Sequence, residues 1–170
     1  MAINYPEGTQ DLPALICQAD VAALPNVYST NSTAWTNISG FTNVIATKKA
    51  NSAILVIITL GALTGDGNTH ALRLTRNGAG IGWGNGEGSR DQHSFRVEGA
   101  GGTINSNHAH GQTWMYVDSP GAAVNTNLTY ALQSRSEAGP FYINRTVSDG
   151  NNGAVYNGRS HSSIILLEIA

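Results

Sequence analysis

Two histidines have the spacing in this sequence that comes closest to a metal site. His108 and His110 are two positions apart, which places both imidazoles on the same side of a β-strand. The other histidines that could supply a third ligand are His70, His93 and His161. The pair stands in a run of loop-forming residues, 105–111, where histidines are usually solvated. We therefore expect no metal and no other cofactor.

Motifs for nucleophilic or phosphate chemistry are missing from the sequence. It holds no Gly-x-Ser-x-Gly elbow and no His-Glu-x-x-His pair. Glycines crowd between Gly78 and Gly88, but a phosphate loop needs a following helix or a Gly-Lys-Ser/Thr end, and the only lysines are Lys48 and Lys49. We interpret the run as a glycine-rich strand with a mobile loop. Asp118, followed by Ser-Pro-Gly, is interpreted as a turn residue at a strand end. The sequence predicts that the protein is not an enzyme.

Aromatic residues leave one binding function open. Trp35, Trp83 and Trp114, together with six tyrosines, could form platforms on which sugar rings stack. Tryptophans in a β-sandwich belong more often to the core or to an interface. Glycan binding is therefore kept as an alternative.

The charge and length of the chain exclude several classes of partner. The 170 residues suffice for one domain with its own core. Only 12% of them are charged and the formal net charge is −2, so neither nucleic acid nor an anionic membrane would be bound through charge. The longest apolar run, 53–58, is far too short to span a bilayer. Cys17 is the only cysteine, which rules out an intrachain disulfide. The first ten residues lack the regions of a secretory signal, so we expect synthesis and use without Sec export.

Short β-rich runs separated by turn residues predict an all-β sandwich or jelly roll. Asn77-Gly78 is a strong signal for a two-residue hairpin turn. No window of eleven or more residues keeps a helical period. The strands we expect are Ala14–Ala19 as an edge strand, then Thr33–Ile38, Ala53–Leu60, Thr69–Arg76, Gly80–Trp83, Ser94–Glu98, Thr113–Asp118, Asn127–Ser134, Phe141–Thr146 and Ser163–Ile169.

Two of these strands are apolar on both faces, whereas a two-sheet sandwich buries only one face of each strand. The residues concerned are Ile54, Leu55, Val56, Ile57, Ile58, Ile164, Ile165, Leu166 and Leu167. Leaving two such side chains in water on each strand forfeits roughly 6 to 12 kcal/mol, comparable with the whole stability of a domain. We expect these residues to form the core or the interface of a symmetric oligomer. The alternative is that the N-terminal arm or a long loop covers them.

The first 30 residues differ from the rest and are interpreted as an extended arm, with the sandwich domain at 31–170. Pro6, Pro13 and Pro25 stand in this segment and disfavour both helices and central strands. The arm nevertheless carries apolar anchors that a solvated tail would not need: Ile3, Tyr5, Leu12, Leu15 and Ile16. We expect these residues to dock the arm on a neighbouring protein.

Several short motifs follow one another along the chain: the opening 3–10, 52–58 with 72–78, Tyr116–Pro120, Tyr142–Arg145 with Asp149, and 162–169. Taken together, they resemble a family of virion proteins of phages that infect cyanobacteria and other marine bacteria. The resemblance covers nearly the whole chain and depends on the joint order of these motifs. The segment 91–111 has no counterpart in the family.

The resemblance implies a trimeric jelly roll like that of tumour-necrosis-factor-type domains, made in the bacterial host cytoplasm and built into the virion. A chain that begins at Met1 and holds one domain plus an arm fits a capsid decoration, or cement, protein on the phage head. Its partners would be two further copies and the major capsid protein or another virion protein. The alternative is a tail-fibre or receptor-binding component that recognises the host surface, including a surface glycan.

Overall fold

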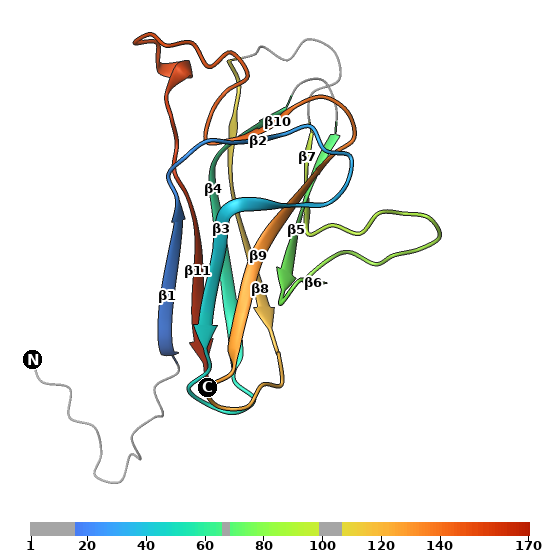
Figure 1. The fold of residues 1–170 in the computed structure, drawn as a ribbon, viewed down its shortest axis with the longest axis vertical. Helices are drawn as coiled ribbons and strands as arrows, with labels where there is room; N and C mark the ends of the chain where they lie inside the picture. The colour runs from blue at the N-terminus through green and yellow to red at the C-terminus, as the bar shows by residue number, and fades with distance from the viewer. Residues whose placement is uncertain (1–15, 66–68, 99–106) are drawn as a thin grey trace, which may run out of the picture.

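The computed structural model describes residues 16–65, 69–98 and 107–170 (Figure 1). In these ranges the chain forms eleven β-strands and one short 3₁₀ turn, Val155–Asn157, with no α-helix. The strands pair antiparallel and form a β-sandwich of two curled sheets. None of these ranges contains a helix that is long and apolar enough to cross a membrane. The predicted all-β class is confirmed.

Sheet A contains six strands. Five follow the order β1-β11-β4-β10-β2, and the sixth, β8, pairs with β4 on the side of β4 that faces away from β11. Its strands are β1 (Ile16–Leu24), β2 (Tyr28–Thr30), β4 (Ala53–Gly65), β8 (His110–Asp118), β10 (Phe141–Ile143) and β11 (Ser162–Ile169). The first half of β4 pairs with β11, and its last three residues pair with β10. β4 therefore lies at the centre of the sheet.

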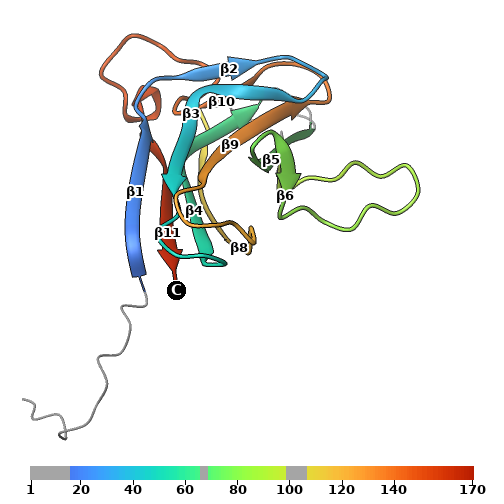
Figure 2. The ribbon, with the colours of Figure 1, turned by 60° about the horizontal axis from the view of Figure 1, so that its bottom comes forward.

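Sheet B contains five strands in the order β3-β9-β5-β6, with β7 also paired to β5. Its strands are β3 (Thr36–Ala46), β5 (Thr69–Arg76), β6 (Ala79–Ile81), β7 (Phe95–Glu98) and β9 (Asn127–Ser136). β3 and β9 lie in front of sheet A in the view of Figure 1, and β2 and β10 close one end of the sandwich in Figure 2. The segment between β6 and β7 extends away from the body in both views.

The predicted strands from residue 33 onward are all present, and the hairpin turn is confirmed. β5 has the predicted bounds, and Asn77 and Gly78 connect it to β6. Both residues have positive φ, 50° and 82°, which a type I′ turn requires. This turn follows directly from local sequence, because few residue pairs other than Asn-Gly accept that backbone conformation.

One strand is longer than expected because a bulge interrupts its alternation. We expected a strand to end at Ile38, but β3 continues to Ala46. The pairing with β9 shifts register between Asn37 and Thr42, and Gly40 within this interval has a φ of +76°. Ile38 and Phe41 are three residues apart and both buried, so the bulge returns the chain to the same face.

Residues 16–30, which we expected to belong to an extended arm with an edge strand at Ala14–Ala19, supply two edge strands of sheet A. β1 pairs with β11 over nearly its whole length, and β2 pairs with β10. The three prolines do not prevent this pairing, because Pro25 falls between β1 and β2 and the other two precede β1. Both strands lie at sheet edges, where irregular chain is tolerated.

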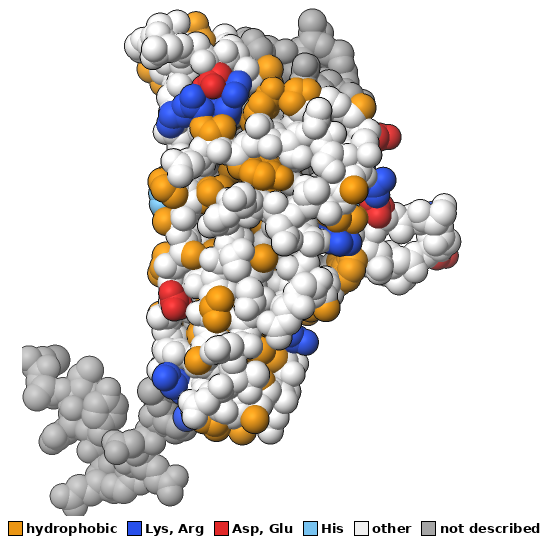
Figure 3. Space-filling view, viewed as in Figure 1, with side chains coloured by type: hydrophobic (Ala, Val, Ile, Leu, Met, Phe, Trp, Pro, Cys, Tyr) orange, Lys and Arg blue, Asp and Glu red, His pale blue; other side chains and the backbone are white. Residues whose placement is uncertain are grey.

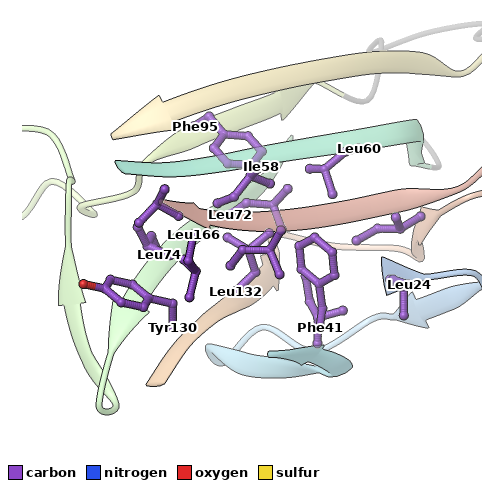
Figure 4. Packing of buried hydrophobic residues seen from close by; sticks show 14 of the residues in the cluster. Leu24, Phe41, Ile58, Leu60, Leu72, Leu74, Phe95, Tyr130, Leu132 and Leu166 are labelled. Atoms are coloured by element: carbon purple, nitrogen blue, oxygen red, sulfur yellow. The ribbon is translucent and has the colours of Figure 1, made fainter. Parts of the chain in front are cut away.

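A single apolar core fills the space between the sheets (Figure 4). Leu72, Leu74 and Leu132 of sheet B meet Ile58 and Leu166 of sheet A. Each of these side chains is fully buried. At roughly 1.5 to 3 kcal/mol per buried side chain, this layer is the main stabilising contribution to the fold.

A buried carboxylate ties the two sheets together at one end of this core. Asp118, at the end of β8 in sheet A, accepts 2.7 Å hydrogen bonds from Arg76 and a 2.6 Å bond from the Tyr130 hydroxyl, both in sheet B. Burial and the hydrogen bond to this carboxylate raise the pKa of Tyr130 well above its usual range. The interpretation of Asp118 as a simple turn residue missed this role, because both partners belong to the other sheet and the sequence does not show how the sheets pack.

Replacing Tyr130 by phenylalanine should lower the free energy of unfolding by about 1 to 2 kcal/mol. The substitution removes one hydrogen bond to a charged acceptor and leaves Arg76 to satisfy Asp118. Equilibrium denaturation at fixed protein concentration measures the change. An unchanged midpoint would show that the hydroxyl contributes nothing to the tie between the sheets.

A second buried carboxylate holds the turn between β3 and β4. Glu168 of β11 is fully buried, and its oxygens accept hydrogen bonds from the backbone N–H groups of Lys48 and Lys49, from Ser52 Oγ and from Gln18 Nε2, at 2.6–3.0 Å. Burial by itself would raise the pKa of Glu168. The hydrogen bonds to the carboxylate together outweigh burial, so the pKa lies below its usual value.

Candidate functional site

The face of sheet A that is turned away from the core is apolar across four strands. Strand register places side chains of β1, β11, β4 and β8 side by side in rows. One row is Val21, Ile165, Ile57 and Met115, and the next is Ala19, Leu167, Leu55 and Val117. We call these two rows the outer face of sheet A.

No described residue covers the outer face of sheet A from solvent. Val21, Met115 and Val117 are 60%, 63% and 55% exposed, whereas the side chains of the two central strands are partly buried between them. Large apolar side chains are rarely left this exposed together on a monomer. The alternative that the N-terminal arm covers these strands stays a prediction for residues 1–15, which lie outside the described ranges.

The dimensions and charge of the outer face of sheet A are suited to an interface. Four strands at about 4.8 Å spacing and two rows about 6.6 Å apart along the strands give an area of roughly 250 Å². Exposed apolar patches of a few hundred Å² are often functional. Neither row contains a charged side chain, so two such faces can meet without like-charge repulsion.

The nine predicted core or interface residues divide between the two sides of sheet A. Five of them point into the core and are fully buried: Ile54, Val56, Ile58, Ile164 and Leu166. The other four lie on the outer face: Leu55, Ile57, Ile165 and Leu167. Strand alternation separates the two sets. An interface role remains a prediction for the second set only.

Sequence reasoning missed the contributions of β1 and β8 to this face. Val21 was assigned to the arm, and Met115 and Val117 were not singled out. The signal available for β8 was the run of four apolar residues from Trp114 to Val117, which is also apolar on both faces. The neighbouring strands become visible only through their pairing with β4 and β11.

Of the five anchors predicted in the arm, only Ile16 lies in the described ranges. It begins β1, is 51% exposed and pairs with Ile169 at the end of β11. Ile3, Tyr5, Leu12 and Leu15 lie outside the described residues. Docking through these residues therefore remains a prediction.

The histidines do not converge in the part of the chain that the structure describes. His108 and His110 are exposed at the start of β8, and no group of three potential ligands gathers among the described residues. His70 is fully buried, with Nδ1 3.1 Å from Ser136 Oγ and its ring stacked on Phe141. Burial lowers the pKa of His70. These positions give no support to a metal role.

The three tryptophans come from different strands or strand ends, and Trp114 lies beside Gly82, which precedes Trp83. Trp114 packs against the core from β8 and stacks on Tyr116 with a centroid distance of 5.7 Å. Trp35 and Trp83 flank Arg73 on the outer face of sheet B. Among the tryptophans, all of which lie in the described ranges, this pair is the one placed to act as an external platform.

Comparison of the chain with models of known protein families and with curated protein sequences gives no match.

Proposed function

We propose that this protein is a structural protein of a phage virion that assembles as a homotrimer through the outer face of sheet A. The observation that carries the proposal is the uncharged apolar surface formed by β1, β11, β4 and β8. Val21, Met115 and Val117 remain more than half exposed on it. Two further copies of the chain can bury it without bringing like charges together.

The strand order supports a jelly-roll topology for each subunit. Four strands in the order β1-β11-β4-β8 face four in the order β3-β9-β5-β7. Among these eight strands, each lies in the opposite sheet from the one before it along the chain, except that β5 and β7 pair within sheet B. Paired four-stranded sheets with such crossings are the jelly-roll arrangement of viral capsid and lectin domains. The resemblance to tumour-necrosis-factor-type domains favours three copies over two.

We place the trimer on the phage head as a decoration protein, attached by the segment that precedes β1. β1 begins at Ile16 at the same end of the sandwich as the C-terminus (Figure 1). Each segment alone could bind the capsid weakly. Three such segments in one trimer would increase the overall affinity, because once one segment is bound the other two are held at a high effective concentration. The loops between β10 and β11 lie at the other end and would face outward.

Sedimentation of the purified chain tests the assembly. We expect a single species with three times the 17.8 kDa mass of the chain at micromolar concentration. A monomer at that concentration would overturn the proposal.

Binding to phage particles that lack the protein tests the location. We expect the intact trimer to decorate heads and a variant lacking residues 1–15 to stay trimeric but fail to attach. Full occupancy of heads by the truncated trimer would overturn the docking role of the segment. Binding to tails or host cells, and never to heads, would instead establish the receptor-binding alternative.

A further inference from the structure

The outer face of sheet B differs from that of sheet A because polar side chains run across it. Figure 3 views the molecule from the side of β3 and β9, and uncharged groups drawn in white make up most of this face. Arg73, Gln133 and Asn37 are neighbours on β5, β9 and β3. Arg73 Nε donates to Gln133 Oε1 at 2.6 Å, and Gln133 Nε2 donates to Asn37 Oδ1 at 2.8 Å.

Two tryptophans frame this polar row from opposite sides. Trp35 comes directly before β3, and Trp83 follows β6 on the far side of β5. The guanidinium carbon of Arg73 lies 4.4 Å from the ring centroid of Trp35 and 5.3 Å from that of Trp83. Both indoles are half-buried, so each is held in place and still reaches solvent. Trp83 is fixed further by close packing on Gly80, where any side chain would collide with the ring.

A polar pocket continues the same face next to the tryptophans. Its volume is about 370 Å³, within the usual range of small-ligand sites. Ala71 contributes to its floor and precedes Arg73 by two residues, or about 7 Å, on β5. Burial lowers the pKa of Arg73, and the charge of Asp91, which also lines the pocket, partly opposes this shift. The aromatic pair and the pocket therefore form one continuous surface.

The charges in the pocket balance one another. Asp91 pairs with Arg135 across the pocket wall, and Arg96 and Glu137 add one charge of each sign. A pocket without excess charge does not select a strong anion or cation. Carboxylates, guanidinium groups and amides together offer donors and acceptors for adjacent hydroxyl groups. Flat indole faces suit the apolar face of a pyranose ring.

We propose that the outer face of sheet B binds a neutral saccharide. One sugar ring stacks on an indole face of Trp35 or Trp83 that Arg73 leaves uncovered, and its hydroxyl groups bond Gln133, Asn37 and the polar groups of the adjacent pocket. This site is independent of the outer face of sheet A, so it stays accessible when that face is buried. It does not depend on whether the trimer sits on a head or on a tail.

Titration of the wild-type assembly with neutral sugars tests the site. The probes are glucose, galactose, mannose, N-acetylglucosamine and their β-1,4-linked disaccharides at up to 50 mM, followed by tryptophan fluorescence and by ligand-detected NMR. We expect saturable binding of at least one sugar. We expect Trp83→Ala and Gln133→Leu each to weaken it by about tenfold or more.

Tyr142→Ala is the matched control, because this ring also carries a guanidinium group, that of Arg145 at 4.2 Å from its centroid, but belongs to β10 of sheet A. It should leave the affinity within about twofold of wild type. Trp83→Ala could disturb the segment that follows β6. Gln133→Leu tests the site without that effect, because Gln133 is a surface residue of β9, a central strand of sheet B. The proposal is overturned if none of the sugars binds, or if the bound sugar retains its affinity in the folded Gln133→Leu variant. Neither result would affect the trimer proposal.

Discussion

If the chain assembles as proposed, aspartate in place of Ile57 should separate the trimer into monomers that keep their fold. Ile57 lies in the middle of an apolar row, between Ile165 and Met115, on the outer face of sheet A. In the trimer a carboxylate at this position would lose its hydration with no cation on either row to pair with it. Such desolvation costs several kcal/mol per ion. In the monomer the same side chain is only partly buried and still reaches solvent.

The expected effect is large because every protomer carries the change. A loss of about 3 kcal/mol per protomer weakens association by roughly a hundredfold for each subunit. Sedimentation at concentrations from micromolar to tens of micromolar should therefore show mainly monomer. Met115→Asp places the charge on the same row at the edge strand β8, where it disturbs the monomer less. We expect the same dissociation from that variant.

Two further substitutions separate dissociation from unfolding. Val44→Asp puts the same charge on the outer face of sheet B, at a valine that is 45% exposed, and should leave both mass and fold unchanged. Val56→Asp buries the charge in the core and should unfold the protein. If Ile57→Asp and Met115→Asp both retain the trimer mass, the outer face of sheet A is not the interface.

Local sequence predicted most of the strands because their limits are set by local chemistry. The turn at Asn77 and Gly78 depends on two adjacent residues, and the strand before it has the predicted bounds. β2 was missed because three residues are too few to show a period. The end of β3 was misplaced because the bulge at Gly40 breaks the alternation that would have revealed the rest of the strand.

Long-range pairing explains what could not be predicted about the two outer faces. The doubly apolar pattern of β4 and β11 indicated an uncovered surface, but only register shows that Val21 and Met115 extend it. The polar row of Arg73, Gln133 and Asn37 joins residues 36 to 96 positions apart. The periodicity within one strand does not show which residues of other strands lie beside it. The same holds for Asp118, whose partners belong to the other sheet.

Glu168→Gln should be the most destabilising conservative change in the subunit, lowering the free energy of unfolding by about 3 kcal/mol at pH 7. The carboxylate accepts from four donor groups while fully buried. A glutamine keeps the shape but offers one neutral oxygen, and its NH₂ group would face a donor. Ser52 and the turn at Lys48 and Lys49 would lose their charged acceptor.

The pH dependence of this difference identifies the carboxylate as its cause. The pKa of Glu168 is lower in the folded protein than the value of about 4.3 for an unperturbed glutamate. Its stabilising contribution is therefore complete above that value and is lost as the pH falls through the lower folded pKa. His70 also makes the protein less stable in acid, because its lowered pKa means that protonation favours the unfolded chain as the pH falls through about 6.5. That contribution is common to wild type and Glu168→Gln, so it cancels in the difference.

Denaturation curves at fixed protomer concentration from pH 7 to pH 3 should thus show a gap between wild type and Glu168→Gln that narrows only in the acidic part of the range. Glu87→Gln is the matched control, since Glu87 is exposed and its contact with Arg90 is a surface ion pair at 3.5 Å. It should change stability by less than about 0.5 kcal/mol at every pH. A gap that is constant with pH would mean that the glutamine packs poorly and that the charge of Glu168 does not hold the β3–β4 turn. A gap below about 1 kcal/mol at pH 7 would mean that the four donors find other acceptors when the carboxylate is removed.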